Sequence, residues 1–133
     1  MGVELFRVIM PVEDLERAQK FYAKVLDMSG ERVSVDRHYF QCGGTILACV
    51  HVARRFRPNM ENVNFAVDNL EATHKLFLEA ISNGLGGEFL EGEFGTIDTR
   101  PWGERSFYAR DPFGNPICFV DSPTKFTGGR FVP

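Results

Sequence analysis

Residues 6–22 read FRVIMPVEDLERAQKFY, and residues 61–77 read ENVNFAVDNLEATHKLF. The two stretches follow one design at a constant offset. The matched residues are Val8 with Val63, Val12 with Val67, Leu15-Glu16 with Leu70-Glu71, Lys20 with Lys75, and Tyr22 with Phe77. A repeat at fixed spacing indicates two copies of one supersecondary unit.

Each copy begins as a strand, because apolar residues alternate with others at a period of two. One face of each strand is wholly apolar, and these residues are Phe6, Val8, Met10 and Val12, then Val63, Phe65 and Val67. The opposite face is mixed and carries Arg7 and Ile9 in the first copy, and Asn62 and Asn64 in the second. We therefore expect each strand to bury one face and to leave the other facing a cleft.

A helix follows each strand. Asp14 in the first copy, and either Asp68 or Asn69 in the second, are suitable N-caps, because a short side-chain oxygen accepts from the first free backbone N–H groups. Apolar stripes at helical spacing continue from both caps. Ser29-Gly30 and Asn83-Gly84 predict where the two helices end.

Strand-like sequence completes each copy. The predicted strands are residues 32–36, 39–42 and 46–50 in the first copy, and 88–91, 96–99, 106–110 and 117–121 in the second. Turns are predicted at Gly43-Gly44 and over residues 111–116. We predict an α+β chain of one domain, 1–133, with two βαβββ modules, about 1–53 and 60–123, joined by a linker at 54–59. Curved mixed sheets would surround a shared cleft.

Composition excludes several classes of protein. The net charge of −3 over 133 residues provides no basic face for nucleic acid. The apolar run Ile46–Val50 is too short to cross a membrane, and the N-terminus lacks the plan of a signal peptide. Three cysteines without CxxC spacing favour a cytoplasmic protein with reduced thiols.

The sequence resembles the vicinal oxygen chelate superfamily, which includes glyoxalases, bleomycin resistance proteins and ring-cleaving dioxygenases. The most specific matches are PVEDLE at 11–16 with Phe21-Tyr22, and WGERSFYARDPFGN at 102–115. The resemblance covers nearly the whole chain. It implies paired βαβββ modules around a concave site, and often a dimer.

In metal-dependent members of that superfamily, four side chains on the first and last strands of the two modules hold one divalent ion. The resemblance places these positions at Arg7, Ala48, Asn62 and Cys118. Arginine offers only donors, and alanine has no ligand atom. Because a catalytic zinc site needs about three protein ligands, we expect no metal and no other cofactor.

Other side chains on the predicted cleft suit ligand binding. Arg7 is interpreted either as a clamp for a carboxylate or phosphate, or as the partner of a carboxylate from Glu93, Glu104 or Asp121. Asn62 and Asn64 would orient a ligand beside it. The predicted aromatic walls are Tyr39, Phe40, Phe94, Trp102 and Tyr108, each alternatively ordinary core, and Ala48 and Cys118 complete the predicted set.

The remaining polar residues favour structural roles. His38, His51 and His74 fall at no ligand position, and no Ser-His-Asp or Cys-His order can be recognised. Asp111 and Asn115 are interpreted as turn-formers rather than catalytic residues.

These features predict a metal-independent small-molecule binding protein resembling the bleomycin-resistance branch. It would act as a homodimer that sequesters a ligand in an aromatic cleft, with no catalytic residue. One alternative is a glyoxalase-like or dioxygenase-like lyase or oxidoreductase with an altered, degenerate metal site. Another is a metal-free enzyme that uses Cys118 or a tyrosine as acid or nucleophile.

Overall fold

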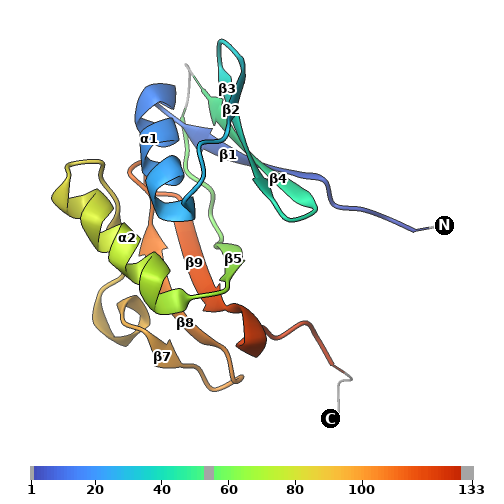
Figure 1. Cartoon of the computed structure of the whole chain (residues 1–133), viewed down its shortest axis with the longest axis vertical. Coiled ribbons are helices and arrows are strands. Elements are labelled where there is room, and N and C mark those ends of the chain that lie inside the picture. The colour runs from blue at the N-terminus through green and yellow to red at the C-terminus, as the bar shows by residue number, and fades with distance from the viewer. Residues whose placement is uncertain (1, 53–55, 130–133) are drawn as a thin grey trace.

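The computed structural model describes residues 2–52 and 56–129. The first module contains β1 (Arg7–Val12), α1 (Leu15–Leu26), β2 (Glu31–Ser34), β3 (Arg37–Cys42) and β4 (Thr45–His51) (Figure 1). The second contains β5 (Val63–Val67), α2 (Leu70–Ser82), β6 (Glu88–Phe89), β7 (Asp98–Thr99), β8 (Arg105–Arg110) and β9 (Pro116–Asp121). Short 3-10 turns occupy Gly92–Gly95 and Ser122–Thr124.

The two sheets share one topology. Their strand orders are β1-β4-β3-β2 and β5-β9-β8-β6, and β7 also pairs with β8. In each sheet the first and last strands of the module are parallel neighbours, β1 with β4 and β5 with β9. The predicted α+β fold of two repeated units is confirmed. The predicted strands at 88–91 and 96–99 are shorter than expected, because a 3-10 turn separates them.

Both helices begin where a side chain caps them. Asp14 accepts a hydrogen bond from the backbone N–H of Arg17 at 3.1 Å, and Asn69, rather than Asp68, accepts from Ala72 at 3.0 Å. Helix α2 ends at Asn83 as predicted. Helix α1 ends earlier than predicted, because Asp27 takes up a left-handed conformation with φ of 54°. Among the described residues, neither helix is long and apolar enough to cross a membrane.

One core joins the modules, because the helices pack against each other beneath both sheets. The rings of Phe21 and Phe77 meet edge to face with centroids 5.6 Å apart, and Lys24 pairs with Glu79 at 3.0 Å. The apolar sides of both sheets belong to one cluster of buried residues. The other side of each sheet, here called its open face, carries no helix.

A buried polar junction also connects the modules. Asp111 accepts from the backbone N–H groups of Phe113 and Asn115, at 2.9 and 2.8 Å, and from the hydroxyl of Tyr22 at 2.7 Å. Asn115 donates to the carbonyl of Pro11 at 2.7 Å. The predicted turn-forming roles of Asp111 and Asn115 fit these contacts, which also bind the turn to the first module.

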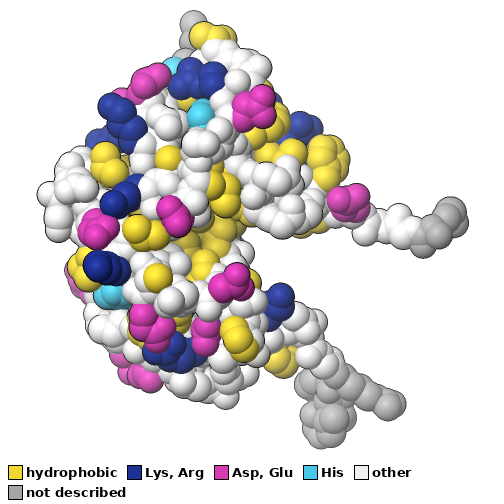
Figure 2. Space-filling model, viewed as in Figure 1, with side chains coloured by type: hydrophobic (Ala, Val, Ile, Leu, Met, Phe, Trp, Pro, Cys, Tyr) yellow, Lys and Arg dark blue, Asp and Glu magenta, His cyan; other side chains and the backbone are white. Residues whose placement is uncertain are grey.

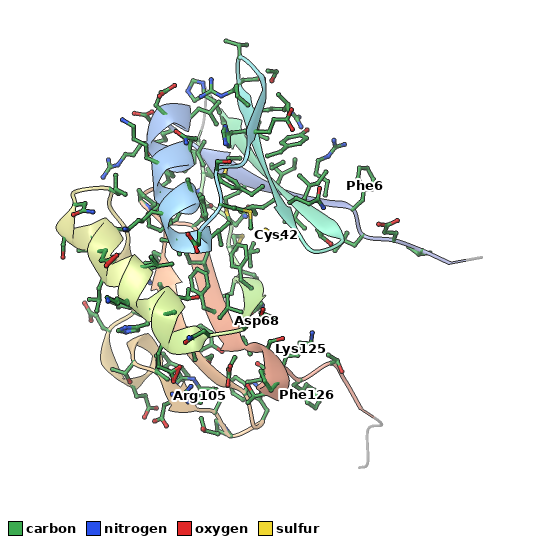
Figure 3. The ribbon with its side chains drawn as sticks, viewed as in Figure 1. Phe6, Cys42, Asp68, Arg105, Lys125 and Phe126 are labelled. Carbon is green, nitrogen blue, oxygen red and sulfur yellow. The ribbon has the colours of Figure 1, made fainter. Side chains whose placement is uncertain are left out.

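A hollow of about 1060 Å³ opens between the modules. Figure 2 shows it as a concave surface with hydrophobic side chains at its base. Cys42 and Asp68 lie on opposite sides of the hollow in Figure 3. Its walls come from the end of α1, the β3–β4 hairpin, strand β5 and the start of α2. The hollow reaches the helix-facing side of the first sheet at Cys42 and Leu47.

Candidate functional site

The open face of the first sheet holds three of the predicted site residues, Arg7, Tyr39 and Ala48. Strand register places Ile9, Ala48 and Tyr39 side by side across β1, β4 and β3. Ala48 is completely buried, although it belongs to this face. Larger neighbours therefore cover Ala48, and it forms the floor of the face.

Two arginines contact one tyrosine on this face. Nη1 of Arg7 donates to the hydroxyl of Tyr39 at 3.2 Å, and Nη1 of Arg37 donates to the same oxygen at 3.0 Å. The guanidinium of Arg7 also lies over the ring of Phe6, 5.0 Å from its centroid. These contacts lower the pKa of Tyr39 from its usual value, with the hydrogen bond from Arg37 as the largest cause.

The alternative interpretation of Arg7, an ion pair with a carboxylate, is not found among the described residues of one chain. We considered a structural ion pair with Glu93, Glu104 or Asp121, but no ion pair among residues 2–52 and 56–129 includes Arg7. Glu93, Glu104 and Asp121 all belong to the second module. Arg7 therefore remains available to an anion from outside the chain.

The open face of the second sheet is uncharged in its central row. Register places Asn64, Cys118 and Tyr108 side by side across β5, β9 and β8. Burial is the largest influence on the Cys118 thiol and raises its pKa to about 11, although the neighbouring hydroxyls of Tyr108 and Ser106 act in the opposite direction. The thiol is therefore protonated at neutral pH and is a poor nucleophile. Asn62 adds a buried side-chain oxygen without a hydrogen-bond partner among the described residues.

Arg100 lies on this second face beside Ser106 and Tyr108, and sequence reasoning missed it. Its side chain is 5% exposed and donates to Ser106 Oγ at 3.0 Å and to several backbone carbonyls. Its guanidinium lies 5.3 Å from the ring centroids of both Phe94 and Tyr108. It belongs to an irregular segment after β7, where no periodicity indicates which side chains turn inward.

The predicted aromatic walls divide between surface and core. Trp102 is 46% exposed, and its Nε1 donates to Glu104 at 2.7 Å. Tyr39 and Tyr108 lie on the two open faces, as the alternation predicted. Phe40 was wrong as a ligand contact. It is completely buried on the helix-facing side, where its ring packs against Tyr22 and His38.

The hollow between the modules does not gather these residues. Of the nine predicted binding residues, only Asn62 and Asn64 line it. The others, apart from Phe40 and Trp102, lie on the two open faces. The expected binding residues therefore form two separate groups in a single chain, one group on each sheet.

His38 and His74 take the structural positions expected of them. The Nε2 atom of His38 lies 3.0 Å from the carbonyl of Ser29, and His74 stacks on Phe89 with centroids 4.8 Å apart. Burial lowers the pKa of His74. The described residues contain no group of three histidines, cysteines or carboxylates that could hold a metal ion.

The residues at the four expected metal positions do not fit a divalent ion. Arg7 is a cation that already donates to Tyr39, and Ala48 has no ligand atom. Cys118 would first have to lose a proton with a pKa of about 11. Only the amide oxygen of Asn62 is free to ligate, and one neutral oxygen does not make a catalytic site.

Comparison with known proteins agrees with this fold. The sequence model of the Glyoxalase/Bleomycin resistance protein/Dioxygenase superfamily matches residues 4–119. None of the curated proteins matches the sequence.

Several solved structures are similar in shape. A glyoxalase/bleomycin resistance protein from Albidiferax ferrireducens T118 superposes with a TM-score of 0.70 and 23% identity, covering 88% of this chain and 98% of that one. The oxidase ChaP-H2 gives 0.71 and 19%, covering 96% and 100%. Glyoxalase I from Zea mays gives 0.71 and 20%, covering 89% of this chain but only 46% of its own. At such identities the likeness shows the fold alone.

Proposed function

Since this chain belongs to the Glyoxalase/Bleomycin resistance protein/Dioxygenase superfamily, we propose that it is a metal-independent small-molecule binding protein. In this proposal the chain resembles the bleomycin-resistance branch. It sequesters its ligand by stacking and polar contacts, without covalent chemistry. The observation that carries the proposal is the residue set at the expected metal positions, Arg7, Ala48, Asn62 and Cys118. These side chains suit hydrogen bonding and packing rather than metal ligation.

Two features of the open faces support binding. Tyr39 and Tyr108 present rings beside polar groups, one on each sheet, and Trp102 offers a partly exposed indole in the loop that precedes β8. Aromatic rings stack on flat molecules, while arginine and amide groups select their orientation. The net charge of −3 gives little attraction for a cationic antibiotic, so the proposal does not extend to bleomycin itself.

The proposal includes a homodimer in the cytoplasm. Because the two open faces of one chain hold separate halves of the residue set, a complete cleft would form where the first sheet of one copy meets the second sheet of another. Phe6 and Ile9, which are 55% and 43% exposed beside the first open face, would be covered in that dimer. The three free cysteines suit a reducing compartment.

A ligand screen tests this function. The purified chain is heated with a library of neutral and charged aromatic compounds, since a ligand that binds the folded state raises the melting temperature. We expect hits whose stabilisation falls in Tyr108→Ala and in Trp102→Ala, while Leu78→Ala, which changes an exposed apolar side chain on α2, keeps it. No hit across the library, or equal losses in all three variants, would contradict the proposal.

A second candidate is a glyoxalase-like lyase or dioxygenase-like oxidoreductase with an altered site. The structural likeness to glyoxalase I from Zea mays and to the oxidase ChaP-H2 favours it. It requires metal affinity and turnover, so a stable metal complex with measurable catalytic activity would replace the first proposal. The metal-free alternative through Cys118 is disfavoured, because burial raises the pKa of that thiol to about 11.

A further inference from the structure

Arg7 and Arg37 approach one oxygen from opposite directions. Tyr39 lies in the row of Ile9 and Ala48 across the first sheet, whereas Arg7 lies beside Ile46 and Arg37 beside Val50, in the rows on either side. Both side chains bend toward the middle row, where their Nη1 atoms lie 3.2 and 3.0 Å from the hydroxyl oxygen of Tyr39.

In residues 2–52 and 56–129, these two charges have no ion-pair partner. Arg32, Arg105 and Arg110 each pair with a glutamate. No ion pair among the described residues includes Arg7 or Arg37. Glu31, which lies opposite Tyr39 in the strand register, also forms none. Two guanidinium groups that share one neutral acceptor repel each other, and an anion between them would remove that repulsion.

The cluster also has donors to spare. The oxygen of Tyr39 accepts from both arginines, so its own O–H group is free to donate, and no acceptor for it is found among the described residues. The rings of Phe6 and Tyr39 lie 5.0 and 5.9 Å from the guanidinium of Arg7 and restrict its position. A group of donors held in place before binding is well suited to an oxyanion.

We propose that Arg7, Arg37 and Tyr39 form a binding site for the oxyanion, a carboxylate or phosphate, of a small organic molecule, with Ala48 and Ile9 beneath it. This rests on the proposed function, because it names the chemical class of the ligand for one face of the same cleft. Ala48, which is completely buried, occupies a position where the resemblance places a metal-binding carboxylate. On this face, anion binding would therefore replace cation binding.

Three probes of similar shape test the charge requirement. Benzoate, phenyl phosphate and neutral benzamide are titrated into the 15N-labelled full chain at low salt, and dissociation constants are taken from backbone amide shifts. We expect benzoate or phenyl phosphate to shift amides of β1, β3 and β4, and benzamide to bind at least about tenfold more weakly. The stronger of the two anions identifies whether the group is a carboxylate or a phosphate.

Variants then assign the residues. Arg7→Gln and Arg37→Gln should each weaken anion binding about tenfold or more, and Tyr39→Phe a few fold. Arg37→Lys retains the charge but loses the planar fork, so it should fall between Arg37→Gln and the natural chain. Arg32→Gln is the matched control, because it removes the same charge from the same sheet beside an existing partner, Glu16.

Two results would overturn the inference. One is benzamide binding as tightly as the anions, and the other is Arg32→Gln weakening the anions as much as Arg7→Gln does. If neutral aromatic compounds still bind and depend on Tyr108, only the oxyanion site is rejected. If no probe and no library compound binds, the proposed function fails with it.

Discussion

The open face of the first sheet carries two guanidinium groups on one phenol, whereas the equivalent face of the second sheet carries the buried thiol of Cys118 beside Tyr108. The helix-facing sides of the same sheets are alike, and both contribute to one apolar core. The repeat therefore preserves what folding requires, and it diverges where a ligand would be held. An arginine also lies near each face, but Arg7 is exposed and Arg100 is buried among carbonyls.

The largest effect should come from the junction that joins the modules. Asp111→Ala removes the acceptor for Tyr22 and for two backbone N–H groups, and we expect the free energy of unfolding to fall by about 3 kcal/mol. Urea unfolding measures the change. Tyr22→Phe removes only one of these bonds and should cost about 1 kcal/mol. A loss below about 1 kcal/mol in Asp111→Ala would show that the junction does not stabilise the shared core.

Substitutions of Arg7 and Arg100 should differ in their effect on the free energy of unfolding. Arg100→Gln leaves several carbonyls without their hydrogen-bond donor and should lower the free energy of unfolding by about 2 kcal/mol. Arg7→Gln should change the free energy of unfolding by less than about 0.5 kcal/mol. Thermal unfolding of both variants provides the comparison. If Arg7→Gln destabilises the chain as much as Arg100→Gln, Arg7 is a structural residue.

The pKa values of the tyrosines on the two faces should be shifted in opposite directions. The arginines lower the pKa of Tyr39, because they stabilise the phenolate, while burial raises the pKa of Tyr108. Absorbance near 295 nm should therefore show Tyr39 ionising first as pH rises. Tyr39→Phe should remove the early phase and Tyr108→Phe a later one. The reverse order would mean that the arginines do not contact Tyr39 in solution.

The smallest effect on stability is expected at Trp102. Its indole is 46% exposed, so Trp102→Ala should change the free energy of unfolding by less than about 0.5 kcal/mol. A larger decrease in the free energy of unfolding, measured with urea, would show that this indole stabilises the second module rather than being free to contact a ligand.

Local signals predicted the fold well. The caps at Asp14 and Asn69 act within one helical turn, and alternation in β1 separates Met10 and Val12 from Arg7 and Ile9, so both can be interpreted without knowing the tertiary structure. The same alternation could have excluded Phe40, because it follows Tyr39 in one strand and must point to the opposite face.

The site residues were harder to predict from the sequence than the fold. The expected strand began at Tyr39, two residues after the start of β3, and Arg37 was therefore overlooked. Arg100 gave no signal, since its partners are carbonyls brought close by a 3-10 turn and a loop. How the two open faces lie relative to the hollow depends on the packing of α1 against α2, which neither repeat encodes alone.

Metal content tests the central claim most directly. The purified chain is offered Ni²⁺, Zn²⁺, Mn²⁺ and Fe²⁺ in turn, desalted, and measured for bound metal and melting temperature, with Cys118→Ala as the control for binding through a thiol. Residues such as Arg7 and Ala48 at the expected ligand positions predict no retained ion and no rise in melting temperature. One ion per chain that raises the melting temperature and survives in Cys118→Ala would contradict the claim and favour the enzyme.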